Sequence, residues 1–324
     1  MDDIPFTLAT GMHERARPLA EGRAKPKGID LTTVMLKDNG GRHDRFLKGE
    51  FDGCELSFAV YLTSWAHKAP FEAIPVFFNR QFRHGSIYVN SRAGIREPKQ
   101  LEGKRIGILS WLNSAALWAR GMLRHEYGLD ATRVKWVAAS PPEVPGFELP
   151  AGIQVSSPPG GAPLTDLLVA GEIDALITPR TPVRDNPRDI IRLFPKFQEA
   201  ESQYYRKTGV FPMSHALVVR SHLLEQYPWL AESLFDACQQ AKTLAFEYAD
   251  DPEHSTLAWF AEAMEREADI FGANRWPYGI EPNRKSLEGL VTYAHESGLL
   301  PEKPAIDDLF HPSARKLGLR HDFT

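Results

Sequence analysis

One stretch limits the possible folds of this chain more than any other, the segment KRIGILSWLNSAALWARGML at residues 104–123. Its apolar run at 105–109 lies between charged residues and Ser110, a pattern typical of a short buried strand. Ser110 or Asn113 then stands where a helix N-cap is needed, and Gly128 stands where that helix would end. The segment therefore predicts a strand that leads directly into a capped helix.

A strand followed at once by a helix gathers unpaired backbone N–H groups at the helix N-terminus, and these donors favour an anion. We therefore expect a pocket for a small carboxylate-bearing molecule at this turn. Its expected lining residues are Ser110, Trp111, Asn113 and Ser114. The same pattern also fits an ordinary turn with a capped helix and no ligand, and both interpretations stay open at this point.

Length and charge exclude several classes of protein. A chain of 324 residues is long enough for about two domains with sizeable cores. Its net charge of -4, without a long basic run, argues against nucleic acid and against an anionic membrane surface as partners. The two cysteines, Cys54 and Cys238, are too few for a ligand cluster or a disulfide framework, so we expect free thiols in apolar surroundings.

The N-terminal segment and the apolar runs bear on location. The first residues, MDDIPFTLATGMHERARPLAEG, begin with acidic side chains and lack the apolar core of a secretory signal. The chain also lacks an apolar run of the roughly 18–20 residues that a bilayer-spanning helix needs. The sequence therefore predicts a cytoplasmic protein without a membrane partner.

Short apolar runs alternate with helical patterns along most of the chain. Strands are expected at 6–10, 29–36, 74–79, 86–90, 134–138, 174–179, 190–194 and 216–220. The segment CELSFAVYL at 54–62 is expected to be a further strand or a strand-to-helix turn. Helices are expected at 42–48, at 164–170 and over most of the chain after 221, whereas the segment 140–163 is rich in proline and glycine and predicts a loop. We expect 74–79 and 86–90 to pair with each other. The alternation predicts an α/β protein with mainly parallel strands.

In such sheets ligands bind beyond the carboxyl ends of the strands. Polar side chains follow four of the expected strands, at 11–15, 55–57, 110–114 and 178–181. Because several strand ends carry polar groups where a buried strand would continue with apolar ones, we expect these four segments to form one ligand site.

Five segments carry a resemblance to a known family. They are FDGCELSFAVYL, AIPVFFNRQFRHGSIYVN, EGKRIGILSW, GEIDALITPRTP and TGVFPMSHALVVR, and together they span residues 51–220. With these segments the chain resembles the 4,5-dihydroxyphthalate decarboxylase family, whose members are built on the type II periplasmic-binding-protein fold. The resemblance implies an α/β fold of two lobes joined by hinge strands, with a ligand cleft between them. The expected lobes are residues 1–88 together with 212–324, and residues 89–211.

The resemblance also implies an activity. A hydroxylated aromatic acid such as 4,5-dihydroxyphthalate would lose CO2 without a cofactor and give 3,4-dihydroxybenzoate, a reaction of phthalate catabolism. A different aromatic or heteroaromatic acid stays open as substrate. The alternative is a non-catalytic protein that binds a small carboxylate in the same cleft, and the lack of a secretory signal favours the enzyme. A homo-oligomer also stays open, because the turns at 276–279 and 311–312 are suited either to covering the cleft or to supporting a dimer.

The chemistry of such a reaction calls for a base near a ring hydroxyl and an acid near the ring carbon that loses CO2. His215 is our first candidate for the proton donor, since histidine titrates near neutral pH, and His84 is the second. Glu55 lies at a strand end among apolar residues, where burial would raise its pKa and suit it to act as the base. A structural histidine bonded to backbone, or a salt-bridged carboxylate, is the alternative for each.

Cations are needed to hold the carboxylate that stays on the ring. Arg80, Arg83 and Arg180 are the main candidates, because a guanidinium matches a carboxylate with two hydrogen bonds. Arg180 has the best position, at a strand exit, and Arg15 follows the first strand. Trp111 offers a surface on which an aromatic ring can stack, although core packing would also explain a tryptophan there.

Four residues are of the types that bind divalent metal ions, namely His13, Glu55, His84 and His215. Their spacing along the chain matches no recognised ligand motif. We therefore expect neither a metal nor another cofactor, while use of a divalent metal ion stays open as the alternative. The expected partner is a small aromatic carboxylate.

Overall fold

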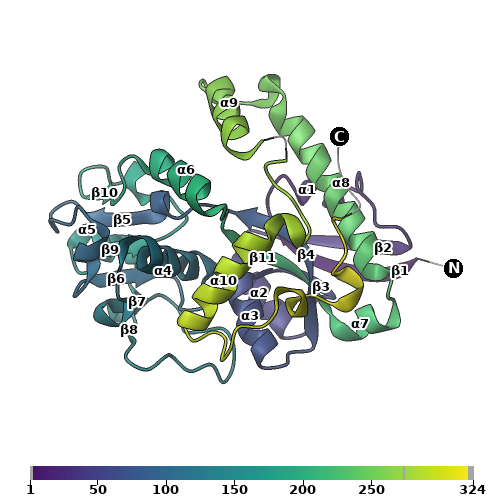
Figure 1. Ribbon diagram of the computed structural model, residues 1–324, viewed down its shortest axis with the longest axis horizontal. Coiled ribbons are helices and arrows are strands. Elements are labelled where there is room, and N and C mark those ends of the chain that lie inside the picture. The colour runs from purple at the N-terminus through teal and green to yellow at the C-terminus, as the bar shows by residue number, and fades with distance from the viewer. Residues whose placement is uncertain (1–2, 273, 320–324) are drawn as a thin grey trace.

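The computed structural model describes residues 3–272 and 274–319. Its strands form two separate sheets, and each sheet is the centre of one lobe of an elongated α/β molecule (Figure 1). The two lobes lie side by side along the longest axis, with the second sheet in one lobe and both chain ends in the other. The predicted α/β architecture of two lobes is confirmed.

The first sheet has the strand order β2-β1-β3-β11-β4. Its strands are β1 (Ile4–Gly11), β2 (Ile29–Leu36), β3 (Gly53–Ser57), β4 (Phe71–Arg80) and β11 (Met213–Arg220). β1 runs parallel to both β2 and β3, whereas β11 runs antiparallel to β3 and β4. The carboxyl ends of β1 and β3 therefore meet the beginning of β11 at one edge of the sheet.

The second sheet has the strand order β10-β5-β9-β6-β7-β8. Its strands are β5 (Ile87–Asn90), β6 (Arg105–Ile108), β7 (Lys135–Ala138), β8 (Gln154–Ser156), β9 (Ala175–Ile177) and β10 (Ile190–Arg192). The four strands β9, β6, β7 and β8 are parallel, and β5 and β10 are added at one edge in antiparallel fashion.

The expected pairing of 74–79 with 86–90 is wrong. β4 pairs with β11 in the first sheet, whereas β5 pairs with β9 and β10 in the second. The short 3-10 turn His84–Ser86 lies between β4 and β5, so this connection carries the chain from one lobe to the other instead of closing a hairpin.

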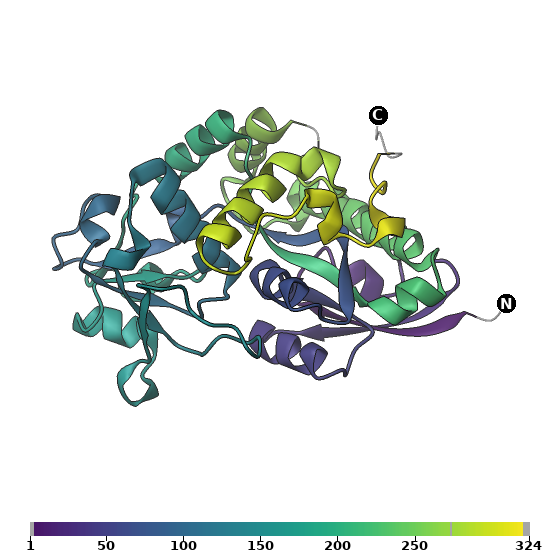
Figure 2. The ribbon, with the colours of Figure 1, turned by 60° about the horizontal axis from the view of Figure 1, so that its bottom comes forward.

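Within the described residues the structure has ten α-helices. They are α1 (Arg17–Ala20), α2 (Asn39–Leu47), α3 (Phe58–Ala66), α4 (Ser114–Tyr127), α5 (Leu164–Ala170), α6 (Phe197–Thr208), α7 (Ser221–Gln226), α8 (Leu230–Asp250), α9 (Phe260–Phe271) and α10 (Arg284–Glu296). The C-terminal helix α10 packs against α4 of the second lobe (Figure 2). α9 and the adjoining end of α8 stand out from the body of the molecule (Figure 1). In the described residues no helix is both long and apolar enough to cross a membrane.

The strand–helix unit predicted at 104–123 is present as β6 and α4. Asn113 is the N-cap, and its side chain accepts a hydrogen bond from the backbone N–H of Ala116 at 3.1 Å. Gly128 ends the helix in the left-handed region at φ 68°, where a residue without a Cβ avoids strain. Asn113, and not Ser110, therefore caps α4.

Both cysteines are buried, which confirms the expectation of shielded thiols. Burial raises the pKa of the Cys54 thiol to about 12, and it raises the pKa of the Cys238 thiol as well. Because the thiolate is the reactive form, we expect Ellman's reagent at pH 8 to label neither residue in the native protein and both in guanidinium chloride. Rapid release of the reporter anion from native protein would contradict this burial.

Candidate active site

Three segments of the first sheet bring His13, Glu55 and His215 together. Glu55 lies on β3, which has β1 on one side and β11 on the other. His13 stands two residues after the end of β1, and His215 on β11 lies opposite Ser57 of β3. Since the strand order puts all three at one sheet edge, residues 42 to 202 positions apart in sequence share one site.

The Glu55 carboxylate is the centre of this group. Its Oε2 accepts hydrogen bonds from the Gly11 backbone N–H at 2.7 Å and from Nε2 of His13 at 2.9 Å. Its Oε1 accepts one from Nδ1 of His215 at 2.6 Å. Arg42 adds a positive charge, with Nη2 3.8 Å from Oε1 and with Nε donating to the Glu55 backbone carbonyl at 3.1 Å. Both carboxylate oxygens thus accept hydrogen bonds from the protein.

These partners decide the charge of Glu55. Burial alone would raise its pKa, but His13, His215 and Arg42 outweigh burial and hold the pKa well below 4.5. The expectation of a raised pKa is therefore wrong, because apolar neighbours in sequence do not reveal three donors that arrive from other segments. At neutral pH Glu55 is an ionised acceptor and not a base of raised pKa.

The ionised carboxylate determines which ring nitrogens carry protons. A carboxylate only accepts hydrogen bonds, so Nε2 of His13 and Nδ1 of His215 must both be donors. In a neutral imidazole the other nitrogen is then an acceptor. Nδ1 of His13 is buried and has no hydrogen-bond partner within the described residues. Burial lowers the pKa of His215, although Glu55 partly offsets this, so His215 is a proton acceptor at rest.

Helix α2 contributes Arg42 and His43, two site residues that the sequence did not single out. Both are buried on the same side of α2 as Phe46. His43 meets the His215 ring edge-on, with the ring centroids 5.5 Å apart, and burial together with His215 and Arg42 lowers its pKa well below 6.5. A signal for them did exist, because two polar residues lie at helical spacing from a core phenylalanine.

Access to this group is from the His13 side. The side chain of Glu55 is 1% exposed and that of His215 is 9% exposed, whereas that of His13 is 17% exposed. Arg15 follows His13 closely, donates from Nε to the Phe78 carbonyl at 2.8 Å and stacks 4.4 Å over the Trp276 ring. Within the described residues no carboxylate lies within ion-pair distance of Arg15, although burial lowers its pKa and the Glu55 charge raises it.

Arg80 and Arg83, the two predicted arginines at and just after the end of β4, have different partners from each other. Arg80 is buried, hydrogen-bonds Asn283 and the Pro277 carbonyl, and contacts aromatic rings, so it connects β4 to the C-terminal segment. Arg83 hydrogen-bonds Ser214, the residue before His215. Burial lowers the pKa of Arg80 to about 9 and that of Arg83 to about 10, so both remain charged at neutral pH.

His84 lies among aromatic residues of the second lobe. Its ring contacts Tyr127, Phe194 and Tyr204, and burial lowers its pKa to about 4. The contacts of His84 are therefore with α4, α6 and β10 neighbours, and not with the Glu55 carboxylate. At neutral pH its ring is uncharged.

The residues predicted at 110–114 divide into three environments. Ser110 hydrogen-bonds Glu143 at 3.0 Å, and Asn113 caps α4. Trp111 is 1% exposed, with its Nε1 donating to the Ser297 carbonyl, so its ring is packed in the core. Ser114 contacts the first lobe, because its Oγ lies 2.8 Å from Oγ of Ser57 and accepts from the Ala59 backbone N–H at 3.0 Å.

Arg180 has an exposed position after β9, and its backbone N–H donates to Thr178 at 3.2 Å. Within the described residues no group of three or more histidine, cysteine, aspartate or glutamate side chains is arranged to hold a metal ion. His13 and His215 approach the two oxygens of Glu55 instead of a common centre.

Known proteins with similar sequences identify the family. No protein-family model matches the chain. A protein of Comamonas testosteroni named 4,5-dihydroxyphthalate decarboxylase is 33% identical over 326 residues, which cover 97% of this chain and 98% of that protein. This chain belongs to the 4,5-dihydroxyphthalate decarboxylase family. A protein of the same name from Pseudomonas putida is 35% identical over 216 residues, 64% of this chain and 83% of its own. Since decarboxylases are carboxy-lyases, this family member is an enzyme of that class.

Solved structures confirm the fold. The periplasmic aliphatic sulphonate binding protein SsuA of Escherichia coli has a TM-score of 0.57 at 12% identity, over 99% of this chain and 96% of that one. The sulfonate-binding protein of Methylobacillus flagellatus has a TM-score of 0.60 at 15% identity, over 99% of this chain and 95% of that one. The desulfurization enzyme DszB has a TM-score of 0.50 at 17% identity, over 98% of this chain and 99% of that one. The 4,5-dihydroxyphthalate decarboxylase family member described here thus has the expected periplasmic-binding-protein fold.

Proposed function

We propose that this enzyme removes one carboxylate from 4,5-dihydroxyphthalate, or from a closely similar hydroxylated aromatic acid, and releases CO2 and 3,4-dihydroxybenzoate. The observation that carries the proposal is the Glu55 carboxylate, which accepts an imidazole N–H on each of its oxygens. This arrangement directs one basic nitrogen of His13 and one of His215 away from Glu55. Membership in the family supports the choice of substrate.

In the proposed reaction His215 is the base and then the acid. Its Nε2 takes the proton of the ring hydroxyl para to the departing carboxylate, and the electron pair of that O–H bond moves into the ring. The ring carbon that bears the carboxylate then takes a proton from the imidazolium and forms a C–H bond. The C–C bond to the carboxylate breaks, CO2 leaves, and its electron pair restores aromaticity. The oxygen anion finally takes a proton from water, so each turnover consumes one proton.

Glu55 and Arg42 support these reaction steps without touching the substrate. The imidazolium of His215 forms against an ionised carboxylate 2.6 Å away, which stabilises the positive charge and fixes the tautomer. Arg42, fully buried, keeps that carboxylate ionised. We therefore assign both as positioning residues. His13 donates the equivalent hydrogen bond to the other carboxylate oxygen, and because its free Nδ1 is buried it is assigned as a third positioning residue.

Arg15 is assigned to hold the carboxylate that stays on the ring. Arg15→Met is expected to raise KM about 10- to 100-fold with a smaller effect on kcat, because hydrogen bonds to a charged group contribute about 1.5–3 kcal/mol. Arg17→Met is the matched control, since Arg17 is half exposed and pairs with Glu14 and Glu21. An unchanged KM in Arg15→Met would transfer this assignment to Arg180, whose own variant is then the next to measure.

The direct test is turnover. Purified protein is incubated with 4,5-dihydroxyphthalate, and CO2 and the ring products are quantified together. We expect one CO2 and one 3,4-dihydroxybenzoate for each substrate consumed. Phthalate, which has no hydroxyl to deprotonate, is expected to bind without reacting. Tight reversible binding of the dihydroxylated acid with no CO2 release would contradict catalysis and favour a binding protein.

A further inference from the structure

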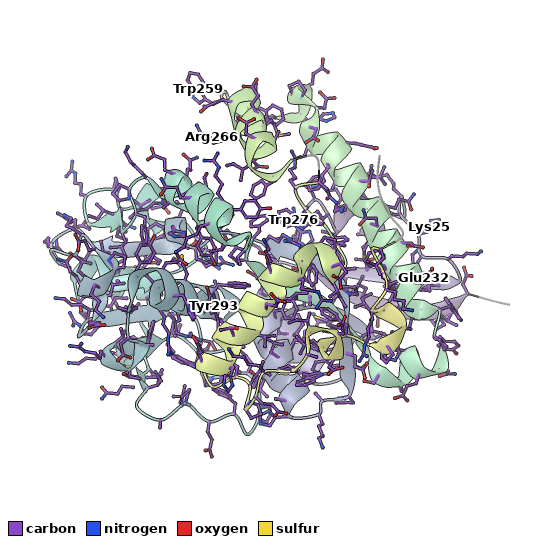
Figure 3. All side chains as sticks on the ribbon, viewed as in Figure 1. Lys25, Glu232, Trp259, Arg266, Trp276 and Tyr293 are labelled. Atoms are coloured by element: carbon purple, nitrogen blue, oxygen red, sulfur yellow. The ribbon has the colours of Figure 1, made fainter. Side chains whose placement is uncertain are left out.

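A cavity of about 450 Å³ lies outside the Glu55 group, on the side of α4 that faces α10. Its walls include Trp111, Arg120, Leu129, Ile153 and Tyr293, and the last of these extends from α10 toward α4 (Figure 3). The volume is within the range of small-molecule sites, which are about 300–1,000 Å³. The cavity therefore has the size and the aromatic lining of a ligand site.

Arg120 is the unusual member of this lining. The residue is 4% exposed, its guanidinium lies 3.8 Å from the centre of the Trp111 ring, and Nη2 donates to the Trp111 carbonyl at 3.0 Å. Its Nε and Nη1 are buried and have no hydrogen-bond partner within the described residues. Burial lowers the pKa of Arg120 to about 9, so it is charged at neutral pH. A buried charge without an opposite charge is costly.

The acidic residues around the cavity do not neutralise Arg120. Glu296 accepts from His125 at 2.8 Å and lies 3.6 Å from Arg124. Asp130 accepts from the backbone and the hydroxyl of Thr132 at 2.9 and 2.7 Å. Both carboxylates are thus engaged elsewhere. In the part of the chain that the structure describes, no carboxylate lies within ion-pair distance of Arg120.

The aromatic side chains that line this cavity are held in place by neighbouring elements. Tyr293 of α10 packs directly over Gly121 of α4, where a Cβ would overlap the tyrosine ring. Trp111 has Arg120 over its ring and packs edge-on against Trp136, with the two ring centroids 5.8 Å apart. Because the two aromatic walls are braced by neighbouring elements, the cavity does not depend on ligand for its shape.

We propose that this cavity binds a small aromatic monocarboxylate, with its carboxylate on Arg120 and its ring against Leu129, Ile153 and Tyr293. The unpartnered nitrogens of Arg120 supply the donors, and Leu129, Ile153 and the Tyr293 ring supply the apolar surface. The site is separate from the Glu55 group. Its occupation does not depend on the proposed reaction.

Equilibrium dialysis of labelled benzoate tests this site, with the uncharged benzamide as competitor of similar shape. Arg120→Met keeps much of the packing on Trp111 and removes the charge. Ala151→Trp fills the cavity from its exposed loop without changing the core. We expect each variant to lose at least 10-fold in benzoate affinity at this site, and benzamide to compete at least 10-fold more weakly than benzoate.

The active-site variant Arg15→Met is included so that a failure of the Arg120 site can be told apart from a failure of the proposed decarboxylase activity. We expect it to retain benzoate binding at the Arg120 cavity, whatever its effect on turnover. Benzoate binding within twofold of wild type in Ala151→Trp, or in a folded Arg120→Met, would overturn the proposal. So would loss of all benzoate binding in Arg15→Met, which would assign the bound benzoate to the active site.

Discussion

Glu55→Gln is expected to lower kcat about 10³- to 10⁴-fold, the size of effect seen when a carboxylate that orients a catalytic histidine becomes an amide. A glutamine side chain has one oxygen acceptor and one NH2 donor, so it cannot accept an N–H from both His13 and His215. One of the two rings must then take the wrong tautomer. Initial rates at saturating substrate measure the change.

The same substitution leaves Arg42 buried without its carboxylate. We therefore expect the free energy of unfolding to fall by about 3–5 kcal/mol, measured by urea denaturation at pH 7. Glu50→Gln is the matched control, because Glu50 is exposed and pairs with Arg45 at the surface. Its kcat is expected to be unchanged and its stability to change by about 0.5 kcal/mol or less. Equal losses of activity in the two variants would contradict the assignment of Glu55.

The stability contribution of Glu55 also has a definite pH dependence. Its pKa is lower in the folded chain than the ordinary 4.5, so the unfolded chain binds the proton more readily. The contribution is therefore complete above about pH 4.5 and is lost as the pH falls further. The free energy of unfolding of Glu55→Gln is therefore expected to fall less steeply than that of the wild type as the pH is lowered below about 4.5.

His215→Ala is expected to lower kcat about 10²- to 10⁴-fold with little change in KM, the range for loss of a general acid–base group. Because burial lowers the pKa of His215, kcat/KM of the wild type is expected to fall with a midpoint below pH 6.5, where the ring becomes protonated and no longer accepts the hydroxyl proton. Added imidazole is expected to restore part of the activity in the space that the truncated side chain leaves.

His222→Ala provides the comparison for His215→Ala, since His222 is an exposed histidine on α7, directly after the same strand. His222→Ala is expected to retain the wild-type kcat and the same fall of kcat/KM at acidic pH. A His215→Ala enzyme with kcat within threefold of wild type would remove His215 from the mechanism.

Much of the fold could be predicted because local patterns dictate it. The β-branched run at 29–36 forms β2 over the same residues, and Asn113 and Gly128 delimit α4 because a cap and a left-handed glycine act within one turn of chain. Helix α6 had no such signal. Its only buried residue is Tyr204, so its sequence lacks an apolar stripe. The partner of β4 could not be predicted either, because β11 lies more than 130 residues further along the chain.

Several residues of the candidate active site could be predicted from the sequence, whereas their protonation and hydrogen bonding could not. Glu55 and His215 stand out as polar residues in apolar strands, and a strand exit explains why the segment of His13 and Arg15 also lies there. The charge of Glu55 could not be predicted, because it depends on donors from three other segments. The surroundings of Trp111 and His84 depend on α10 and α6, which pack against the second lobe from distant parts of the chain.

The central claim is that the ionised Glu55 holds His13 and His215 in opposite tautomers. Long-range ¹H–¹⁵N correlation spectra of the imidazole nitrogens measure this directly, with His13→Gln and His215→Gln variants for assignment. At pH 8 we expect the proton of His215 on Nδ1 and that of His13 on Nε2. A proton on Nε2 of His215 would contradict the account, because its Nδ1 could then no longer donate to Glu55.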